Sequence, residues 1–427
     1  MKKLVLVIII MAIFTSIFLL FHLKTKPLGQ FWMLEPGKGD IYQFENIDYA
    51  TLSPDKKWLC VIKDNRINIF AIESSFKIAK DENAVTGYYP LYPLHVFWVG
   101  DWLIVYGLLE YPLIVEHYNT LEISGEGSGI FTHYKDKGVI LGWNKKWKES
   151  ITHLPVNFNH NWKLIATNID LYSFFVPGYD GKTIAILDSS TGDECKGFLY
   201  SISTGRRLRA IRWKGVVVRG QENYFHYPKI LIWDKNKRKA WSTENEYLRV
   251  GPNTVGAPTL IVTDFDGNFK KLNGKHKKEW LHRDRLYAQP SPDKIAVIIV
   301  KSPTLKPGDL AKTIGSSNPD EIWLAHYSTT KKIWEEKIPW KKIRLENSEI
   351  IAITPDGKGL VFQDGIGKEI WKASKVRVWI YRVGKQPKLI TYMSPIEEVI
   401  GWLDNRHLLV IMGKKRFISV IEIPSFY

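Results

Sequence analysis

The stretch Ile350–Phe362 reads IIAITPDGKGLVF, and residues 376–389 continue it as VRVWIYRVGKQPKL after a polar insert. The turn Pro355-Asp356-Gly357-Lys358 ends the first apolar run, because proline fixes φ and glycine readily adopts a positive φ. Apolar runs on both sides of such turns predict short strands. The four predicted strands are Ile350–Thr354, Gly359–Phe362, Val376–Arg382 and Leu389–Tyr392. Together they predict one antiparallel sheet whose apolar faces must pack against neighbouring sheets.

The same turn recurs elsewhere in the chain. Copies stand at Ser53-Pro54-Asp55-Lys56-Lys57 and Ser291-Pro292-Asp293-Lys294, and an apolar strand follows each. Looser copies lie near residues 100, 160 and 404. The turn resembles the Ser/Thr-Pro-Asp-Gly-Lys signature of TolB-like and WD-repeat β-propellers. This resemblance implies an all-β fold of four-stranded blades, and it says almost nothing about chemistry.

Two other segments resemble parts of propeller blades. Ser328–Trp334 and Asp234–Trp241 are similar to the Thr-Gly-Lys-x-x-Trp endings of quinoprotein-type propellers, although neither has the full repeat. The match leaves a quinoprotein or assembly-factor relative open and implies no cofactor. Asp264-Phe265-Asp266-Gly267-Asn268 looks like the outer hairpin of a TolB-like blade. A calcium loop would need further ligands that the following residues lack.

The spacing of the turns predicts the number of blades. Turns lie near residues 54, 100, 160, 292, 355 and 404, and the gap between 160 and 292 requires another. We place that turn at Gly220-Gln221-Glu222-Asn223. We therefore expect about seven four-stranded blades, with six or eight as alternatives, in a propeller domain over residues 40–427.

The N-terminal segment predicts a membrane anchor. Leu4–Leu23 is almost wholly apolar and follows Lys2 and Lys3. About 20 helical residues span the hydrocarbon core of a bilayer, whereas a cleavable signal peptide has a shorter apolar core and small residues at its cleavage site. We expect a signal anchor with one transmembrane helix over residues 1–26 and a linker over 27–39. The chain would then be a single-pass protein of the cell membrane, with the propeller on the extracytoplasmic side.

The last blade lacks one strand in the sequence pattern. Glu397–Trp402, Arg406–Ile411 and Phe417–Ile423 predict three strands, and Asp40–Phe44 predicts an isolated strand before the first blade. An unpaired edge favours aggregation, and closure of the ring removes it. We therefore predict that Asp40–Phe44 completes the last blade as its outer strand.

Charge and aromatic content point to binding but leave alternatives open. The formal net charge is +16, which favours anionic partners such as lipid headgroups, cell-wall polymers or nucleic acid. A basic soluble surface with no partner would have the same composition. The 17 tryptophans suit either packing between blades or an aromatic surface for a ligand.

The two cysteines predict no metal site. Cys60 lies in a predicted strand and should be a small buried hydrophobic residue. Cys195 lies in a stretch rich in Gly, Asp and Ser, which predicts a loop. Two cysteines cannot form a metal cluster or a disulfide framework, and whether these two pair stays open.

Common catalytic motifs are absent from the sequence. It contains no GxxxxGK[ST] phosphate loop, no HExxH and no GxSxG. We expect a binding module without catalysis, cofactor or metal. Carboxylates brought together from different blades leave an alternative open, a propeller enzyme that acts on cell-wall or extracellular glycan.

Two long loops predict the binding surface. Lys301–Asp320 and Gln363–Lys375 join the second and third strands of consecutive blades, and loops longer than about 12 residues are usually functional or disordered. We expect both on the rim opposite the Pro-Asp turns, where they would bind a protein or an anionic polymer rather than nucleic acid. Loops that merely tolerate insertion are the alternative. The predicted binding residues are Lys306, Lys312, Lys368, Trp371, Lys372 and Lys375.

Overall fold

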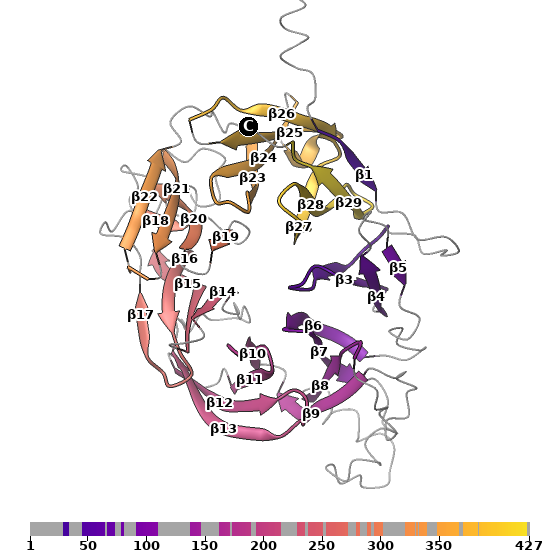
Figure 1. The fold of residues 1–427 in the computed structure, drawn as a ribbon, viewed down its shortest axis with the longest axis vertical. Coiled ribbons are helices and arrows are strands. Elements are labelled where there is room, and N and C mark those ends of the chain that lie inside the picture. Colours follow the sequence, from indigo (N-terminus) through magenta and orange to yellow (C-terminus); the bar gives the residue numbers. More distant parts are fainter. Residues whose placement is uncertain are drawn as a thin grey trace, which may run out of the picture.

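The computed structural model of the chain has an all-β architecture (Figure 1). It describes residues 29–33, 45–64, 66–72, 78–80, 91–109, 137–146, 162–170, 173–188, 194–214, 229–234, 238–250, 253–271, 279–281, 288–291, 294–301, 321–328, 330–331, 333–339, 348–366, 370–382 and 384–424. The strands of this part form seven antiparallel sheets that follow one another around a ring (Figure 1).

The first four sheets follow one another in chain order. Sheet 1 comprises β2 (Tyr49–Leu52), β3 (Trp58–Lys63), β4 (Arg66–Ile72) and β5 (Ile78–Lys80). Sheet 2 comprises β6 (Leu91–Val99), β7 (Trp102–Leu109), β8 (Lys137–Trp143) and β9 (Trp162–Asp170). Sheet 3 comprises β10 (Phe174–Pro177), β11 (Thr183–Asp188), β12 (Glu194–Ser201) and β13 (Arg207–Lys214). Sheet 4 comprises β14 (Lys229–Asp234), β15 (Lys239–Val250), β16 (Asn253–Thr263) and β17 (Phe269–Lys271).

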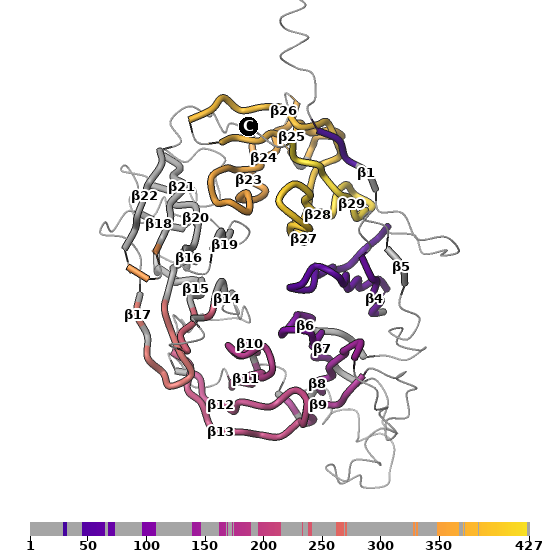
Figure 2. Tube along the Cα trace, viewed as in Figure 1, coloured from indigo at the N-terminus to yellow at the C-terminus, as the bar shows by residue number. Residues whose placement is uncertain are grey.

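Three further sheets complete the ring. Sheet 5 comprises β18 (Glu279–Leu281), β19 (Ala288–Ser291), β20 (Lys294–Lys301), β21 (Glu321–Ser328) and β22 (Ile333–Pro339). Sheet 6 comprises β23 (Ser348–Ile353), β24 (Gly359–Gly365), β25 (Val376–Arg382) and β26 (Lys388–Met393), with the 3₁₀ turn η3 (Ile370–Lys372) between β24 and β25. Sheet 7 comprises β27 (Ile396–Trp402), β28 (His407–Met412), β29 (Phe417–Glu422) and β1 (Phe31–Met33). The tube in Figure 2 runs from indigo in sheet 1 to yellow in sheet 7, and these two sheets are neighbours.

The Ser/Thr-Pro-Asp turns owe their shape to the aspartate. Between β2 and β3, the Ser53 hydroxyl donates to Asp55 Oδ1 (2.6 Å), and the same oxygen accepts the Lys57 amide (3.1 Å). The same bonds recur between β23 and β24 in Thr354, Asp356 and Lys358. Such local side-chain bonds stabilise turns. The aspartates of these two turns therefore have a structural role.

Apolar layers lie between successive sheets. Cys60 of sheet 1 shares one buried cluster with Trp98, Trp143 and Trp162 of sheet 2. Other clusters join sheets 2 and 3, sheets 3 and 4, sheets 6 and 7, and sheets 7 and 1. The ring centroid of Trp143, which is fully buried, lies 5.2 Å from that of Trp58 and 6.3 Å from that of Trp98. The sequence allowed two roles for the tryptophans, packing between blades or an aromatic surface for a ligand. Trp143 has the first, since it packs between sheets.

An N-terminal strand completes sheet 7, but it is not the predicted one. β1 pairs antiparallel with β29 and occupies the outer edge of the sheet (Figure 1). The Gly29 amide donates to the Ile390 carbonyl (2.9 Å), and Phe31 packs against the cluster between sheets 6 and 7. The position predicted for Asp40–Phe44 is therefore filled by part of the predicted linker 27–39. Asp40–Phe44 lies outside the described residues.

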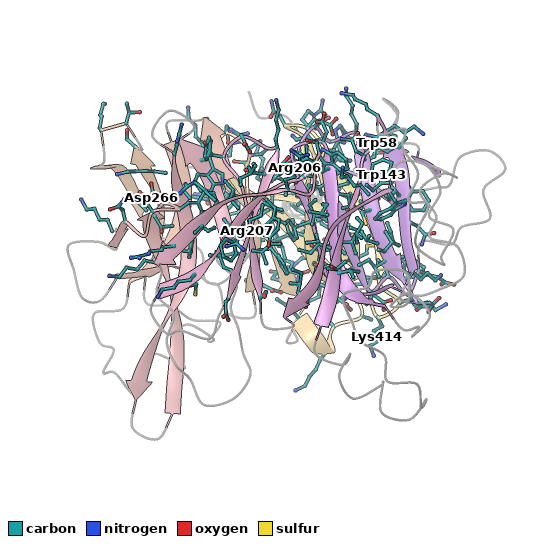
Figure 3. All side chains as sticks on the ribbon, turned by 90° about the horizontal axis from the view of Figure 1, so that it is seen from below. Trp58, Trp143, Arg206, Arg207, Asp266 and Lys414 are labelled. Atoms are coloured by element: carbon teal, nitrogen blue, oxygen red, sulfur yellow. The ribbon has the colours of Figure 1, made fainter. Side chains whose placement is uncertain are left out.

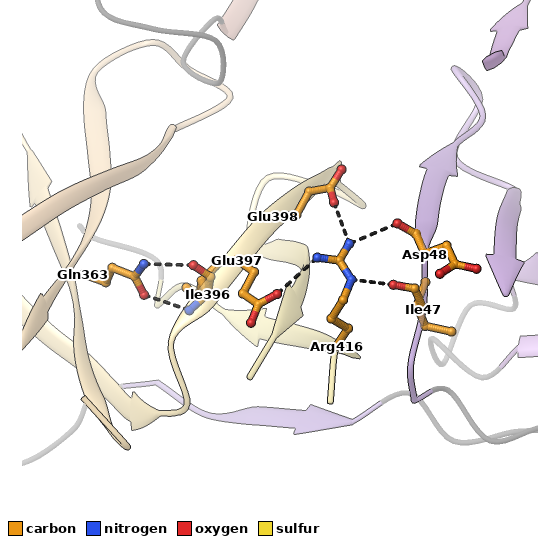
Figure 4. A network of polar contacts seen from close by, with 7 residues as sticks. All are labelled: Ile47, Asp48, Gln363, Ile396, Glu397, Glu398 and Arg416. Atoms are coloured by element: carbon orange, nitrogen blue, oxygen red, sulfur yellow. Dashed lines mark hydrogen bonds and ion pairs between the residues drawn. The ribbon is translucent and has the colours of Figure 1, made fainter. Parts of the chain in front are cut away.

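Arg416 joins sheet 7 to the start of sheet 1 (Figure 4). Its guanidinium donates to the backbone oxygens of Ile47 (2.5 Å) and Asp48 (3.1 Å). It also contacts the carboxylates of Glu397 and Glu398, each at 3.1 Å. Hydrogen bonds between charged groups are among the stronger polar contacts in proteins. Arg416 thus links two sheets that are far apart in the sequence.

Gln363 forms a comparable link between sheets 6 and 7 (Figure 4). Its fully buried side chain accepts the Ile396 amide (2.8 Å) and donates to the Ile396 carbonyl (2.9 Å). The same amide nitrogen contacts Glu349 (2.9 Å). The prediction that a loop begins at Gln363 is wrong, because β24 continues to Gly365. A buried polar side chain needs hydrogen-bond partners, and here the neighbouring sheet supplies them.

The turn predicted near residue 160 does not open a new sheet. β9 pairs with β8 and is the last strand of sheet 2. Sheet 3 begins at β10, and in its first turn the Asp180 carboxylate accepts the amides of Lys182 (2.9 Å) and Thr183 (3.0 Å). This turn lacks the Ser/Thr-Pro-Asp order, so the motif did not reveal it. The turn proposed at Gly220-Gln221-Glu222-Asn223 lies outside the described residues.

The outer hairpin predicted at residues 264–268 is confirmed. These residues join β16 to β17, the outer strand of sheet 4. Asp264 Oδ1 accepts the backbone amides of Asp266 (2.9 Å) and Asn268 (3.0 Å). The acidic residue Asp264 therefore shapes the turn, as Asp55 does in sheet 1.

Both cysteines are buried, and neither forms a disulfide in the part of the chain that the structure describes. Cys60 lies in β3, as predicted, and burial raises the pKa of its thiol. The loop predicted around Cys195 is wrong, because this residue lies in β12 and packs between sheets 3 and 4. Its polar neighbours Glu194 and Lys196 hid the apolar position within an alternating strand.

The predicted membrane anchor stays a prediction. Leu4–Leu23 lies outside the described residues. Within the ranges given above, no helix has the length and apolar character needed to cross a membrane.

Candidate functional site

The predicted binding loops are described only in part. Three of their lysines fall outside the described residues, namely Lys306, Lys312 and Lys368. Trp371 lies in η3, but its side chain is not described. Lys372 and Lys375 are exposed. The assembly of all six residues into one site stays a prediction.

The β28–β29 turn adds two exposed lysines that sequence reasoning missed, Lys414 and Lys415. This turn joins the second and third strands of sheet 7, as the η3 segment does in sheet 6. In Figure 3, Lys414 lies on the rim opposite Trp58, which follows a Pro-Asp turn. The run Gly413-Lys414-Lys415-Arg416 was the available signal.

An open groove of about 710 Å³ lies along sheet 3. Its walls come from β11, β12, β13 and the β16–β17 turn of sheet 4. Buried apolar residues such as Leu187 and Ile211 line it together with charged residues such as Arg209 and Asp266. The groove therefore combines apolar and charged side chains, as many binding sites do.

Basic side chains dominate the strands at this groove. Residues 206–210, around the start of β13, are all exposed. The acidic residues that line the groove are Asp188 and Asp266. Figure 3 shows Arg206 and Arg207 together and Asp266 on the side of sheet 4. The exposed basic residues on β12, β13 and the turn between them are Lys196, Arg206, Arg207, Arg209, Arg212 and Lys214.

Three of these arginines make few contacts with the rest of the described chain. Arg207 stacks on Phe198, with its Cζ 2.9 Å from the ring centroid. Arg209 pairs with Asp266 at 3.0 Å, but both side chains are exposed, and such surface pairs contribute little to stability. Arg206 makes no ion pair with a described residue. These arginines therefore remain accessible to a ligand.

The arrangement is suited to binding anions. Guanidinium groups offer planar, paired donors that match carboxylate and phosphate oxygens. Among the residues with described positions, no group of three His, Cys, Asp or Glu side chains has a geometry that could hold a metal ion. The chemistry that these side chains provide is charge and hydrogen bonding.

Sequence reasoning missed the groove, although a signal was present. Arg206–Lys214 reads RRLRAIRWK, and its exposed cations stand close together in the chain. A basic run of this length is visible in the sequence, but its place on the outer strand of a sheet is not. Phe198 and Asp266, which lie beside the run, come from β12 and from the β16–β17 turn.

Comparisons with known proteins concern the fold. No protein-family model matches the chain, and no curated protein matches it. The β-propeller domain of the Trilobed protease from Pyrococcus furiosus is 10% identical over 90% of this chain and 97% of that chain, with a TM-score of 0.45. A putative TolB from Agrobacterium tumefaciens is 12% identical over 69% of this chain and 80% of that chain, with a TM-score of 0.33.

A WD40 domain is also similar. The Pan2 WD40 domain of Neurospora crassa is 9% identical over 94% of this chain and 98% of that chain, with a TM-score of 0.41. The similar structures are thus β-propellers of the two kinds that the turn motif resembles.

Proposed function

We propose that this protein is a membrane-anchored β-propeller that binds an anionic macromolecule at the groove along sheet 3, without chemistry of its own. The observation that carries the proposal is the row of exposed arginines on and just before β13, of which Arg209 lines the groove and Arg206 and Arg207 precede it in the chain. Clustered accessible cations attract polyanions and increase their association rate.

The remaining parts of the proposal come from the sequence and the sheets. Leu4–Leu23 is long and apolar enough for a single membrane span, which would place the propeller on the extracytoplasmic side. Each of the seven sheets among the described residues would be one blade. The partner would be a protein or an anionic polymer. The lysines of the predicted loops, Lys372 and Lys375 included, would extend the basic surface on another part of the ring.

A binding assay with a defined polyanion tests the proposed function. Full-length protein in detergent is titrated with fluorescent dextran sulfate at several salt concentrations, and with fluorescent neutral dextran as the control. We expect binding of the sulfated polymer that weakens as salt screens the charges. Reversal of charge by Arg207→Glu with Arg209→Glu should weaken it at least about tenfold.

A matched variant controls for net charge. Lys57→Glu with Lys385→Glu changes the net charge by the same amount at exposed positions on sheets 1 and 6. This variant should keep most of the binding. Equal losses in the two double variants would mean that the binding depends on overall charge and would refute the groove as the site.

A further inference from the structure

β13 is the outer strand of sheet 3 and is unusually exposed. The sheet order β10-β11-β12-β13 ends there. Leu208 is 53% exposed, and Ala210 is exposed as well. An uncovered edge strand presents backbone groups that can pair with another extended chain.

Sheet 4 covers only the C-terminal half of this edge. The Arg212 amide donates to the Phe265 carbonyl (3.0 Å), and the Thr263 hydroxyl donates to the Lys214 carbonyl (2.8 Å). Arg212 therefore directs its backbone groups away from β12. Ala210, two residues earlier in the same strand, directs its backbone in the same way. The described residues place no strand beside Ala210 on that side.

The exposed side chains on this free edge are mainly cationic, and Asp266 of the β16–β17 turn pairs with one of them, Arg209. Arg207 and Arg209 flank the exposed Leu208, and Arg206 precedes them. A register shift in the pairing of β12 with β13 lies at this point, opposite Leu199 and Tyr200. Such irregularities often end regular pairing and re-aim side chains. The edge thus offers backbone donors and acceptors, a row of charges and a small apolar contact.

We propose that an extended acidic segment of a partner protein adds to sheet 3 as a further strand along the N-terminal half of β13, with its backbone paired to Ala210 and its carboxylates bound by Arg207 and Arg209. This inference rests on the proposed function and specifies its partner. When a peptide adds to a sheet as a strand, its main-chain hydrogen bonds provide affinity and the contacts of its side chains provide specificity. A peptide matches this edge better than a sulfated or phosphorylated polymer, because only the peptide has amides to pair with the strand.

The test separates strand addition from attraction of charges. A fluorescein-labelled peptide of Glu-Glu-Val-Val repeats, whose carboxylates point to both faces of an added strand, is titrated into full-length protein in detergent, and binding is followed by fluorescence anisotropy. Ala210→Pro removes an amide that faces away from β12, so the sheet loses no bond of its own. We expect this variant to bind the peptide about fivefold more weakly. Its affinity for dextran sulfate should be unchanged.

A second measurement avoids any change to the protein. The same peptide with N-methylated backbone amides keeps its charges but cannot donate to the strand, so it should bind the unaltered protein more weakly. Equal binding of the methylated and unmethylated peptides, with no effect of Ala210→Pro, would overturn strand addition and leave the proposed function intact. Binding of dextran sulfate without binding of the peptide would also overturn it. Failure of both probes would refute the proposed function itself.

Discussion

The outer strands of sheets 3 and 6 occupy equivalent places in their sheets but differ in burial. β13 is exposed at six of its eight positions, whereas β26 is buried at four of its six. The segment before β1 covers β26, since Gly29 donates to Ile390, and β1 covers the outer edge of the neighbouring β29. Sheet 4 meets the backbone of β13 at Arg212 and Lys214, and its Asp266 reaches the side chain of Arg209. The outer strands are therefore covered where the two ends of the chain meet, whereas the outer strand of sheet 3 is largely exposed.

The arginines of the two regions differ in the same way. Arg416 in sheet 7 directs its guanidinium to two backbone oxygens and two carboxylates of the chain itself. Arg206 on sheet 3 has no ionic partner among the described residues. Burial of a charge requires such partners, whereas an exposed charge does not. We therefore expect mutations where the two ends of the chain meet to affect stability and mutations at the open edge of β13 to affect binding.

The largest effect should follow loss of β1. Replacement of Phe31-Trp32-Met33 by Gly-Ser-Gly in the full chain would remove the strand pairing with β29 and the packing of Phe31. We expect the free energy of unfolding to fall by about 3 kcal/mol. Urea denaturation measures this loss. Size-exclusion chromatography should also detect self-association through the exposed β29 edge. An unchanged urea midpoint would mean that β1 does not seal the ring.

Loss of the Arg416 side chain should have the second largest effect. Arg416→Ala leaves the carbonyls of Ile47 and Asp48 without this donor and removes the ionic partner of Glu397 and Glu398. We expect a decrease in the free energy of unfolding of about 2 kcal/mol. Lys414→Ala in the same turn is the matched control and should stay within about 0.5 kcal/mol. Similar results for the two variants would contradict the assigned role of Arg416.

Acid should weaken the turn between β23 and β24. Burial raises the pKa of Asp356, but bonds from the Thr354 hydroxyl, the Lys358 amide and Arg382 outweigh it, so the net pKa is lowered. The stabilisation is therefore complete above the unfolded value of about 3.9 and is lost as the pH falls through the lower folded-state pKa.

The measurement for this turn is the pH dependence of unfolding. Because Asp356 is partly exposed, its contribution should be small, about 0.5 kcal/mol. The Asp356→Asn variant should lose less stability than the unaltered protein between about pH 4 and pH 2. A parallel pH dependence in both proteins would show that the aspartate does not contribute.

The smallest effect on stability is expected at the open edge. Arg206→Ala and Arg209→Ala should each change the free energy of unfolding by less than about 0.5 kcal/mol, since neither side chain has a buried partner. The same variants should weaken the binding of dextran sulfate. Destabilisation comparable to that of Arg416→Ala would abolish the distinction between the two regions.

Much of the sheet structure could be predicted from the sequence, whereas the candidate site could not. The Pro-Asp turns at Asp55 and Asp356 were recognisable because their bonds join residues close together in the chain. The short β1 was read as linker, since three residues carry little alternation. The first turn of sheet 3 was not recognised, because it uses Asp180 without the motif order. The predicted lysine site on the loops stays untested where it falls outside the described residues.

The sequence by itself determined that this chain forms short strands, where several of its turns lie, and that it carries a surplus of positive charge. Only the tertiary structure decided which outer strands are covered. The alternation of residues in β13 and β26 specifies their two faces, but the cover of an edge comes from segments far away in the chain. The amide of Gly29 bonds to the carbonyl of Ile390, which lies more than 300 residues later in the chain, and the carbonyl of Phe265 accepts the amide of Arg212 in β13. Local patterns cannot encode such contacts, because they depend on how the ring closes.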